Sequence, residues 1–236
     1  MGQKSLLVAA GVVSLAGIVL IWAGVGGLLS GGGPEPVAAV TPEPVMSLPA
    51  PATSLPAPAT SLPAPVASLP VPAGKIAKPM RPARPVAVYI PSIGVSAPLM
   101  ELGLDTGGTI QNPPIERPNL AGWYRYGAVP GQRGAAVITG HLDTRTGPAV
   151  FARLKDVERG DQVQVQRADR SVAVFVVDRI EHTPKRSFPA RKVYGDLRYP
   201  GLRLVTCGGV FDGRAHSYQD NTIVYAHLAA PYHPRS

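Results

Sequence analysis

A proline-rich repeat of seven residues limits which part of this chain can fold. Residues 47–74 read SLPAPAT, SLPAPAT, SLPAPVA and SLPVPAG. Two prolines in each repeat exclude an α-helix, because proline lacks the backbone N–H and clashes with the preceding turn. Such a tract favours polyproline II and cannot bury a core. We therefore assign residues 31–84 to a disordered or polyproline II linker, and the folded domain to residues 85–236.

The linker would reach on the order of 170 Å at about 3.1 Å per residue. It follows Ser5–Leu29, a stretch dominated by Leu, Ile, Val, Ala and Gly and without a charged side chain. About twenty apolar residues cross a bilayer as a helix. A cleaved signal peptide, processed near Ala38, is the alternative. The length of the stretch favours an uncleaved transmembrane helix over residues 1–30, and Lys4 favours a cytoplasmic N-terminus with the remainder outside the cell.

The charge of the chain lies in its folded part. The net charge is +8, and residues 1–74 contain only Lys4, Glu35 and Glu43 as charged side chains. A basic domain suits nucleic acid, anionic lipid or acidic wall polymers. No nucleic-acid motif is present, and the aromatic residues do not interleave with the basic ones, so we expect no nucleic-acid partner. The absence of HExxH, paired-cysteine and EF-hand patterns gives no support for a metal or another cofactor.

The single cysteine, Cys207, lies at the end of an apolar run, LRLVTCGG, from Leu202 to Gly209. The pattern predicts a buried strand that ends in two glycines, which leave the sulfur uncrowded. A lone buried cysteine is often simply a small apolar residue. A second run, AVITGHLDT, places His141 at a similar strand end. Because a thiol needs a nearby base or cation to become a thiolate, Cys207 and His141 together suggest acyl transfer.

The folded part reads as many short strands with few helical residues. Alternation in DQVQVQ is typical of a half-buried strand, and the aromatic residues of WYRY are expected in core or wall packing rather than in a binding site. The best helix candidate is Pro148–Leu154, with Val150 and Phe151 on one side. Short strands with Gly/Pro loops predict an all-β closed barrel. Strands are expected at 85–90, 92–95, 136–139, 161–166, 171–177, 202–207 and 222–226, and a loop at 104–118.

Four segments in this order, TGHLDT, GPAVFARL, LVTCGGVFD and YQDNTIVYA, resemble the sortases, and most closely the actinobacterial class F type. The resemblance covers roughly Arg84 to Leu228. It implies an eight-stranded barrel with one or two short helices and with His141 and Cys207 beside one groove. The bias toward Ala, Pro, Gly and Arg is in keeping with a GC-rich Gram-positive bacterium.

The resemblance also implies the reaction. Cys207 would attack the Thr–Gly bond of an LPXTG-like sorting signal on a surface protein and form a thioester. His141 would protonate the leaving amine, and an amine of a peptidoglycan precursor would resolve the thioester. This describes a membrane-anchored cysteine transpeptidase, single-pass and extracellular, and the lack of an extra domain favours wall anchoring over pilus polymerisation.

The third sortase residue, an arginine just before the last strand, is not evident in this chain. Asn221 stands directly before the predicted strand, Gln219 is also uncharged, and Arg214 lies eight residues before Thr222. Arg214 would need a folded-back loop to reach the site. Asn221 would donate a neutral hydrogen bond, weaker than a charge-assisted one. Both stand as candidates for the oxyanion donor.

Two other functions compete with this interpretation. An L,D-transpeptidase would place His and Cys a residue apart, as in SHGC, and no such stretch surrounds Cys207. A catalytically weak or silent sortase-like barrel that binds the cell wall is favoured by the missing arginine. The remaining histidines, His182, His216, His227 and His233, lack the strand-end setting and are expected at the surface or in packing.

Overall fold

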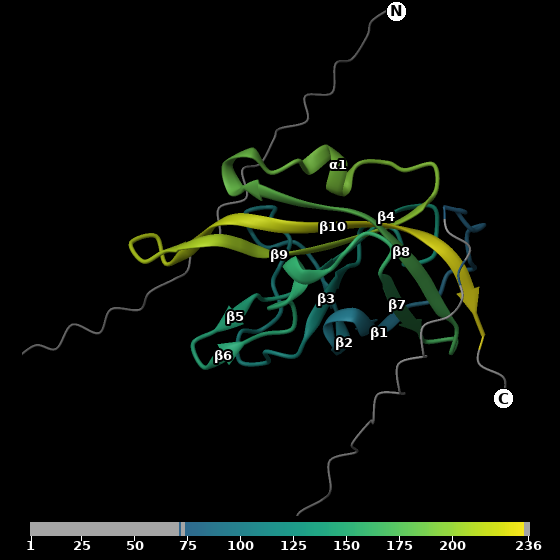
Figure 1. The fold of residues 1–236 in the computed structure, drawn as a ribbon, viewed down its shortest axis with the longest axis horizontal. Helices are drawn as coiled ribbons and strands as arrows, with labels where there is room; N and C mark the ends of the chain where they lie inside the picture. The colour runs from purple at the N-terminus through teal and green to yellow at the C-terminus, as the bar shows by residue number, and fades with distance from the viewer. Residues whose placement is uncertain (1–70, 72–73, 234–236) are drawn as a thin grey trace, which may run out of the picture. The chain divides into compact units, whose positions relative to one another are not determined.

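The computed structural model describes residues 71 and 74–233 of the chain. Within them, eight strands close into a barrel in the order β1-β2-β3-β4-β9-β10-β8-β7 (Figure 1). The pairs β2–β3 and β4–β9 are parallel, and the others are antiparallel. The barrel strands are β1 (Pro85–Ile90), β2 (Val95–Leu102), β3 (Ala121–Tyr124), β4 (Gly134–Thr139), β7 (Gln162–Arg167), β8 (Val172–Pro184), β9 (Pro200–Asp212) and β10 (Ser217–Tyr232).

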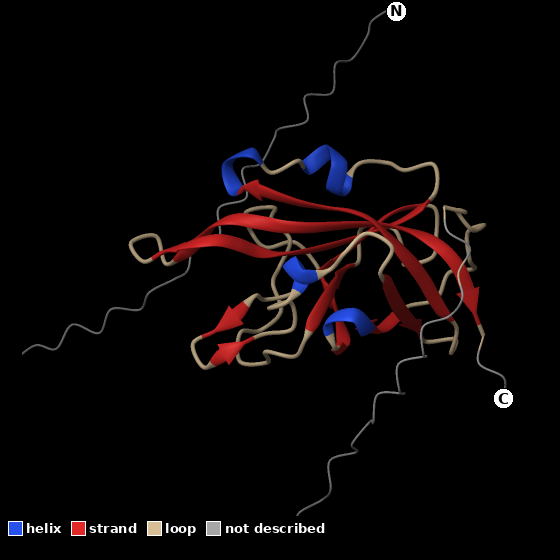
Figure 2. Cartoon of the chain, in the orientation of Figure 1, coloured by secondary structure: helices blue, strands red, loops and turns tan. Residues whose placement is uncertain are grey.

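The remaining elements are short (Figure 2). A two-stranded hairpin pairs β5 (Asp143–Thr144) with β6 (Gly147–Pro148). The helical segments are the 3-10 turns η1 (Pro91–Ile93), η2 (Leu154–Asp156) and η3 (Lys185–Ser187), and the five-residue helix α1 (Ala190–Tyr194). The expected all-β closed barrel of eight strands with few helices is confirmed.

Two local predictions are wrong. The helix expected over Pro148–Leu154 is a strand residue, a series of turns and the start of η2. Its apolar residues Val150, Phe151 and Leu154 are nevertheless buried, because the turns fold them onto the barrel core. The strand expected at 92–95 begins only at Val95, because Pro91 opens a 3-10 turn that closes at Gly94 with φ of +69°.

Apolar residues fill two layers around β4, β9 and β10. The barrel interior holds Ile138, Leu204 and Val224 among its core residues. On the outer face, Val205 and Ile223 pack with Val193 of α1. Strands that are buried on both faces read as continuous apolar runs, which explains the sequences AAVIT, LRLV and TIVYA. These strands form a rigid support for the residues at their ends.

Residues 75–84, at the end of the predicted linker, run along the barrel without regular secondary structure. The backbone N–H of Ala77 donates to the carbonyl of Leu228, and that of Met80 donates to Gly131. The domain boundaries stay predictions, and the predicted anchor over residues 1–30 lies outside the described residues. Among the residues that the structure describes, no helix is long and apolar enough to span a membrane.

Candidate active site

Cys207 lies near the point where β9 leaves the barrel. Its Cα pairs with that of Asn221 on β10, and burial along β9 ends two residues later, at the exposed Gly209. The two glycines after the cysteine are required by the close approach of β10. A Cβ at Gly208 would lie 2.8 Å from Thr222 Oγ1, and one at Gly209, where φ is +75°, would lie 2.2 Å from Asp220 Oδ2. Any other residue there would have to displace these β10 side chains, and at Gly209 it would also strain the backbone.

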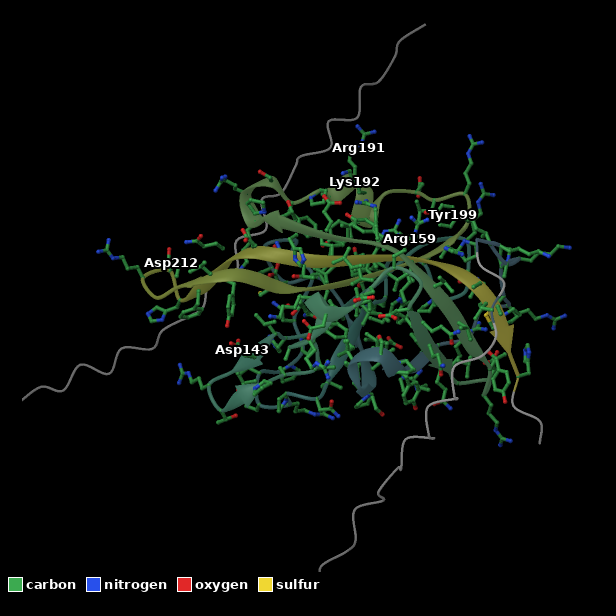
Figure 3. The ribbon with its side chains drawn as sticks, viewed as in Figure 1. Asp143, Arg159, Arg191, Lys192, Tyr199 and Asp212 are labelled. Atoms are coloured by element: carbon green, nitrogen blue, oxygen red, sulfur yellow. The ribbon has the colours of Figure 1, made fainter. Side chains whose placement is uncertain are left out.

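Beyond Cys207, β9 and β10 extend as a hairpin arm, and the β5–β6 hairpin lies at the same end of the barrel (Figure 1). The Tyr218 hydroxyl of β10 donates a hydrogen bond to the Asp143 carboxylate of β5. Figure 3 shows Asp143 on that hairpin and Asp212 out along the arm. The hydrogen bond therefore joins the two hairpins beside the cysteine.

A cavity of about 520 Å³ lies between these elements and includes Cys207. Its wall combines the β5–β6 hairpin with parts of β8, β9 and β10 and with residues near η2. Its lining residues are Leu142, Asp143, Thr144, Gly147, Pro148, Ala152, Lys155, His182, Thr206, Cys207, Gly208, Gly209 and Thr222. A partly buried thiol in the wall of an open cavity is accessible to a substrate.

Three influences act on the Cys207 thiol. Burial raises its pKa, because the thiolate loses hydration. The Lys185 ammonium lowers the pKa, through its charge and as a hydrogen-bond donor, and the Asp143 carboxylate raises it by charge repulsion. The net direction is upward. The free thiol is therefore mostly protonated at neutral pH, and the reaction needs a group that favours the thiolate.

His141 follows β4 closely, and local contacts fix its loop. Gly140 packs against Phe151, since a Cβ there would lie 2.7 Å from the Phe151 ring. The Gly140 carbonyl accepts a hydrogen bond from Thr206 Oγ1 at 2.9 Å, and the His141 carbonyl accepts one from the Phe151 N–H at 3.0 Å. These contacts hold the TGH segment beside the residue that precedes Cys207.

The His141 imidazole itself lies against a different loop. Its Nε2 is 2.7 Å from the carbonyl oxygen of Pro113, which can only accept, so Nε2 carries a proton and donates. His141 is not among the residues that line the cavity. The structure thus brings the His141 backbone next to β9 and leaves the imidazole on Pro113.

The two other predicted residues differ in their relation to Cys207: Asn221 is its cross-strand partner, and Arg214 lies in the turn between β9 and β10. Asn221 is 9% exposed and pairs with Cys207 on one side and Thr183 of β8 on the other. Cross-strand partners point to the same face of a sheet, so Asn221 and Cys207 share one face. Arg214 is exposed in the turn between β9 and β10, where its N–H donates to Asp212 Oδ1. It does not line the cavity.

Sequence reasoning missed Lys185, Asp143 and Tyr218. Asp143 stands two residues after His141 and could have been noted there. Tyr218 and Lys185 carry no comparable signal, because their relation to Cys207 depends on how β8, β9 and β10 pair. Of the other histidines, His182 also lines the cavity, with Nδ1 3.0 Å from Thr222 Oγ1, and His227 pairs with Asp178 at 2.6 Å. Within residues 71 and 74–233, no group of three His, Cys, Asp or Glu side chains could hold a metal ion.

We predict that Tyr218→Phe loosens the β5–β6 hairpin. The Asp143 carboxylate raises the pKa of Tyr218 to about 12. The hydroxyl therefore keeps its proton, and with it the hydrogen bond, at every pH below the usual pKa of tyrosine. The bond is lost as the pH rises through about 12. Without the hydroxyl, we expect faster amide hydrogen exchange at residues 143–148 and a loss of about 1–3 kcal/mol of stability at most. Phenylalanine keeps the ring contact with Phe211, 5.2 Å between centroids. Unchanged exchange would show that this bond does not hold the hairpin.

The geometry defines a protein with a thiol as its candidate nucleophile, held by a closed barrel and surrounded by titratable groups. The sequence matches the Sortase domain family over residues 88–229, more than half of the chain. The chain belongs to the sortase family, whose members are cysteine transpeptidases.

Solved sortase structures are similar to the chain at low sequence identity. Sortase A from Corynebacterium diphtheriae is 21% identical with a TM-score of 0.47, over 66% of this chain and 65% of that one. Sortase A of Listeria monocytogenes is 15% identical with a TM-score of 0.49, over 66% and 93%. Sortase C of Streptococcus pneumoniae is 21% identical with a TM-score of 0.49, over 65% and 72%. No curated protein matches the sequence.

Proposed function

We propose that this protein is a membrane-anchored cysteine transpeptidase, similar to class F sortases, with its catalytic domain outside the cell. It would cleave an LPXTG-like sorting signal between Thr and Gly and transfer the surface protein to an amine of the cell wall. The observation that carries the proposal is the placement of Cys207 in the wall of an open cavity, where charged groups act directly on its sulfur.

The proposed reaction has two steps. The Cys207 thiolate attacks the Thr carbonyl carbon, the C–N bond breaks, and the glycine amine leaves with a proton from the His141 imidazolium. In the second step, an acceptor amine attacks the thioester and returns a proton to His141, and the thiolate leaves. A thioester remains reactive toward amines, which suits transfer rather than storage.

The position of His141 sets a requirement for this mechanism. Its Nε2 is engaged by the Pro113 carbonyl, so the proton transfer needs either Nδ1 or a turn of the ring away from Pro113. Catalytic hydrogen bonds often form only when the substrate is bound. Substrate in the cavity would then bring the imidazole toward the leaving amine.

The test is a transfer assay with the full-length chain in detergent. A quenched LPXTG peptide and a triglycine amine are supplied, and mass spectrometry follows the acyl-enzyme at Cys207. We expect cleavage together with a peptide–amine product. A bound thioester without transfer would move the proposal toward a hydrolase, and the absence of both would contradict it.

A silent wall-binding barrel is the second candidate. It is favoured by the raised pKa of Cys207 and by the engagement of His141 with Pro113. Such a protein would bind purified peptidoglycan in a pull-down assay but form no thioester. Binding that is unchanged in Cys207→Ala, combined with no acyl-enzyme in the parent chain, would favour this candidate over the transpeptidase.

A further inference from the structure

Lys185 enters the site from β8, the strand on the far side of β10 from Cys207. Thr183, Asn221 and Cys207 form one row across β8, β10 and β9. β8 ends at Pro184, which pairs with Asp220, and Lys185 is the first residue of η3. The chain therefore turns off the sheet next to that row, and the Lys185 ammonium is near enough for its charge to act on the Cys207 thiol. This proximity is made by the fold, since 22 positions separate the two residues in the sequence.

The Lys185 ammonium is held from β10 as well. Its Nζ donates to Ser217 Oγ at 2.6 Å, and Ser217 is the first residue of β10. In the described part of the chain, Lys185 forms no ion pair with a carboxylate. An ammonium has three donors. One donor goes to Ser217, which leaves two further donors and a positive charge that acts on the Cys207 thiol.

The titratable groups of the site come from five elements. Lys185 of η3 favours the thiolate and Asp143 of β5 opposes it. Tyr218 of β10 donates to the same Asp143 carboxylate, which takes up part of that opposing charge. The other titratable groups in the cavity wall are Lys155 of η2 and His182 of β8. The His141 imidazole is on Pro113.

We propose that Lys185 is the catalytic cation of this site: its ammonium, positioned by Ser217, donates to the Cys207 sulfur and stabilises the thiolate that attacks the substrate. This inference rests on the proposed function for its role in catalysis. It assigns the positive charge near the nucleophile to Lys185 of η3, whereas the sequence indicated only Arg214 and Asn221 as candidates for the third catalytic residue. Arg214 is exposed in the turn, and Asn221 has no charge.

The test measures how fast iodoacetamide alkylates Cys207 as a function of pH in the full-length chain. The iodoacetamide carbon bonds to the thiolate sulfur and iodide leaves, so the rate follows the thiolate fraction. Cys207 is the single cysteine of the protein, so the signal is unambiguous. An opposite charge close to an acid typically lowers its pKa by 1–3 units. We expect Lys185→Gln to move the alkylation midpoint upward by about one unit and to lower the rate at pH 7 about tenfold.

Three further variants make the measurement specific. Lys185→Arg keeps the charge and is expected to restore most of the rate. Ser217→Ala frees the ammonium and is expected to give a smaller upward shift. Arg186→Gln removes one positive charge from the same 3-10 helix at an exposed position, and it is expected to leave the midpoint unchanged. Equal midpoint shifts in Lys185→Gln and Arg186→Gln would show that the effect follows the net charge of the protein, and they would overturn the proposal. The absence of a midpoint shift in Lys185→Gln would overturn it as well.

The alkylation readout needs no sorting signal, so it separates this inference from the proposed function. A midpoint shift in Lys185→Gln without any peptide transfer by the parent chain would support the Lys185–Cys207 pairing and contradict the proposed substrate. Peptide transfer by the parent chain with no midpoint shift in Lys185→Gln would support the transpeptidase function and contradict the role proposed for Lys185. Where transfer is observed, Lys185→Gln is expected to lower kcat more than it raises KM, because the cation acts on the nucleophile.

Discussion

Replacing Cys207 by alanine is expected to abolish the acyl-enzyme and to lower transfer at least about 10⁴-fold, because no other group in the chain can form a thioester. The substitution removes one sulfur from the wall of an open cavity, so the fold should be retained. Peptide transfer by the full-length chain in detergent, with intact-mass analysis of the protein, checks the prediction.

The His141→Ala variant extends this test to the pair. Residues that act as one catalytic unit give non-additive losses, so the double variant should be no slower than Cys207→Ala alone. Multiplying losses would indicate that His141 acts independently of Cys207. If Cys207→Ala retained transfer, the thioester mechanism would be wrong and the cavity would have to use another nucleophile.

Much of the barrel could be predicted from the sequence because its strands have simple patterns. The alternation in QVQVQ marks β7, and the apolar runs in AAVIT, LRLV and TIVYA mark β4, β9 and β10. The lengths were underestimated, since β8 and β10 continue through polar residues such as Glu181 and Asp220. Those residues are kept in strand conformation by the long ladder between β8 and β10, which local sequence does not reveal.

The candidate site was less predictable than the fold. Cys207 and His141 stand out because each follows an apolar strand and a glycine is nearby. Lys185 follows a proline in a basic surface segment, and nothing local separates it from Arg186. Its effect on Cys207 arises because β10 lies between β8 and β9, so that the end of β8 is in register with the Cys207 segment of β9. Residues brought together by strand order require the topology.

Phe151 connects the barrel core to the loop of the candidate catalytic histidine. Its side chain is fully buried in the interior cluster, its ring lies against Gly140, and its N–H donates to the His141 carbonyl. Phe151→Ala is expected to cost about 3–5 kcal/mol of stability, the lost burial plus the cavity that remains. For a domain of this size, each kcal/mol corresponds to about 2–4 °C in Tm, so a fall of roughly 10 °C is expected by calorimetry.

Phe211→Ala is the matched control, because the same atoms are removed from a side chain that is 52% exposed on the β9–β10 arm. It should cost about 1 kcal/mol or less, chiefly the edge contact with Tyr218. Below its melting temperature, Phe151→Ala should also lose transfer activity, because the loop of His141 loses its support while Cys207 stays on β9. Equal Tm changes in the two variants would contradict the core role of Phe151. A lower Tm with full transfer activity would show instead that Thr206 and Gly140 alone are sufficient to hold the His141 loop.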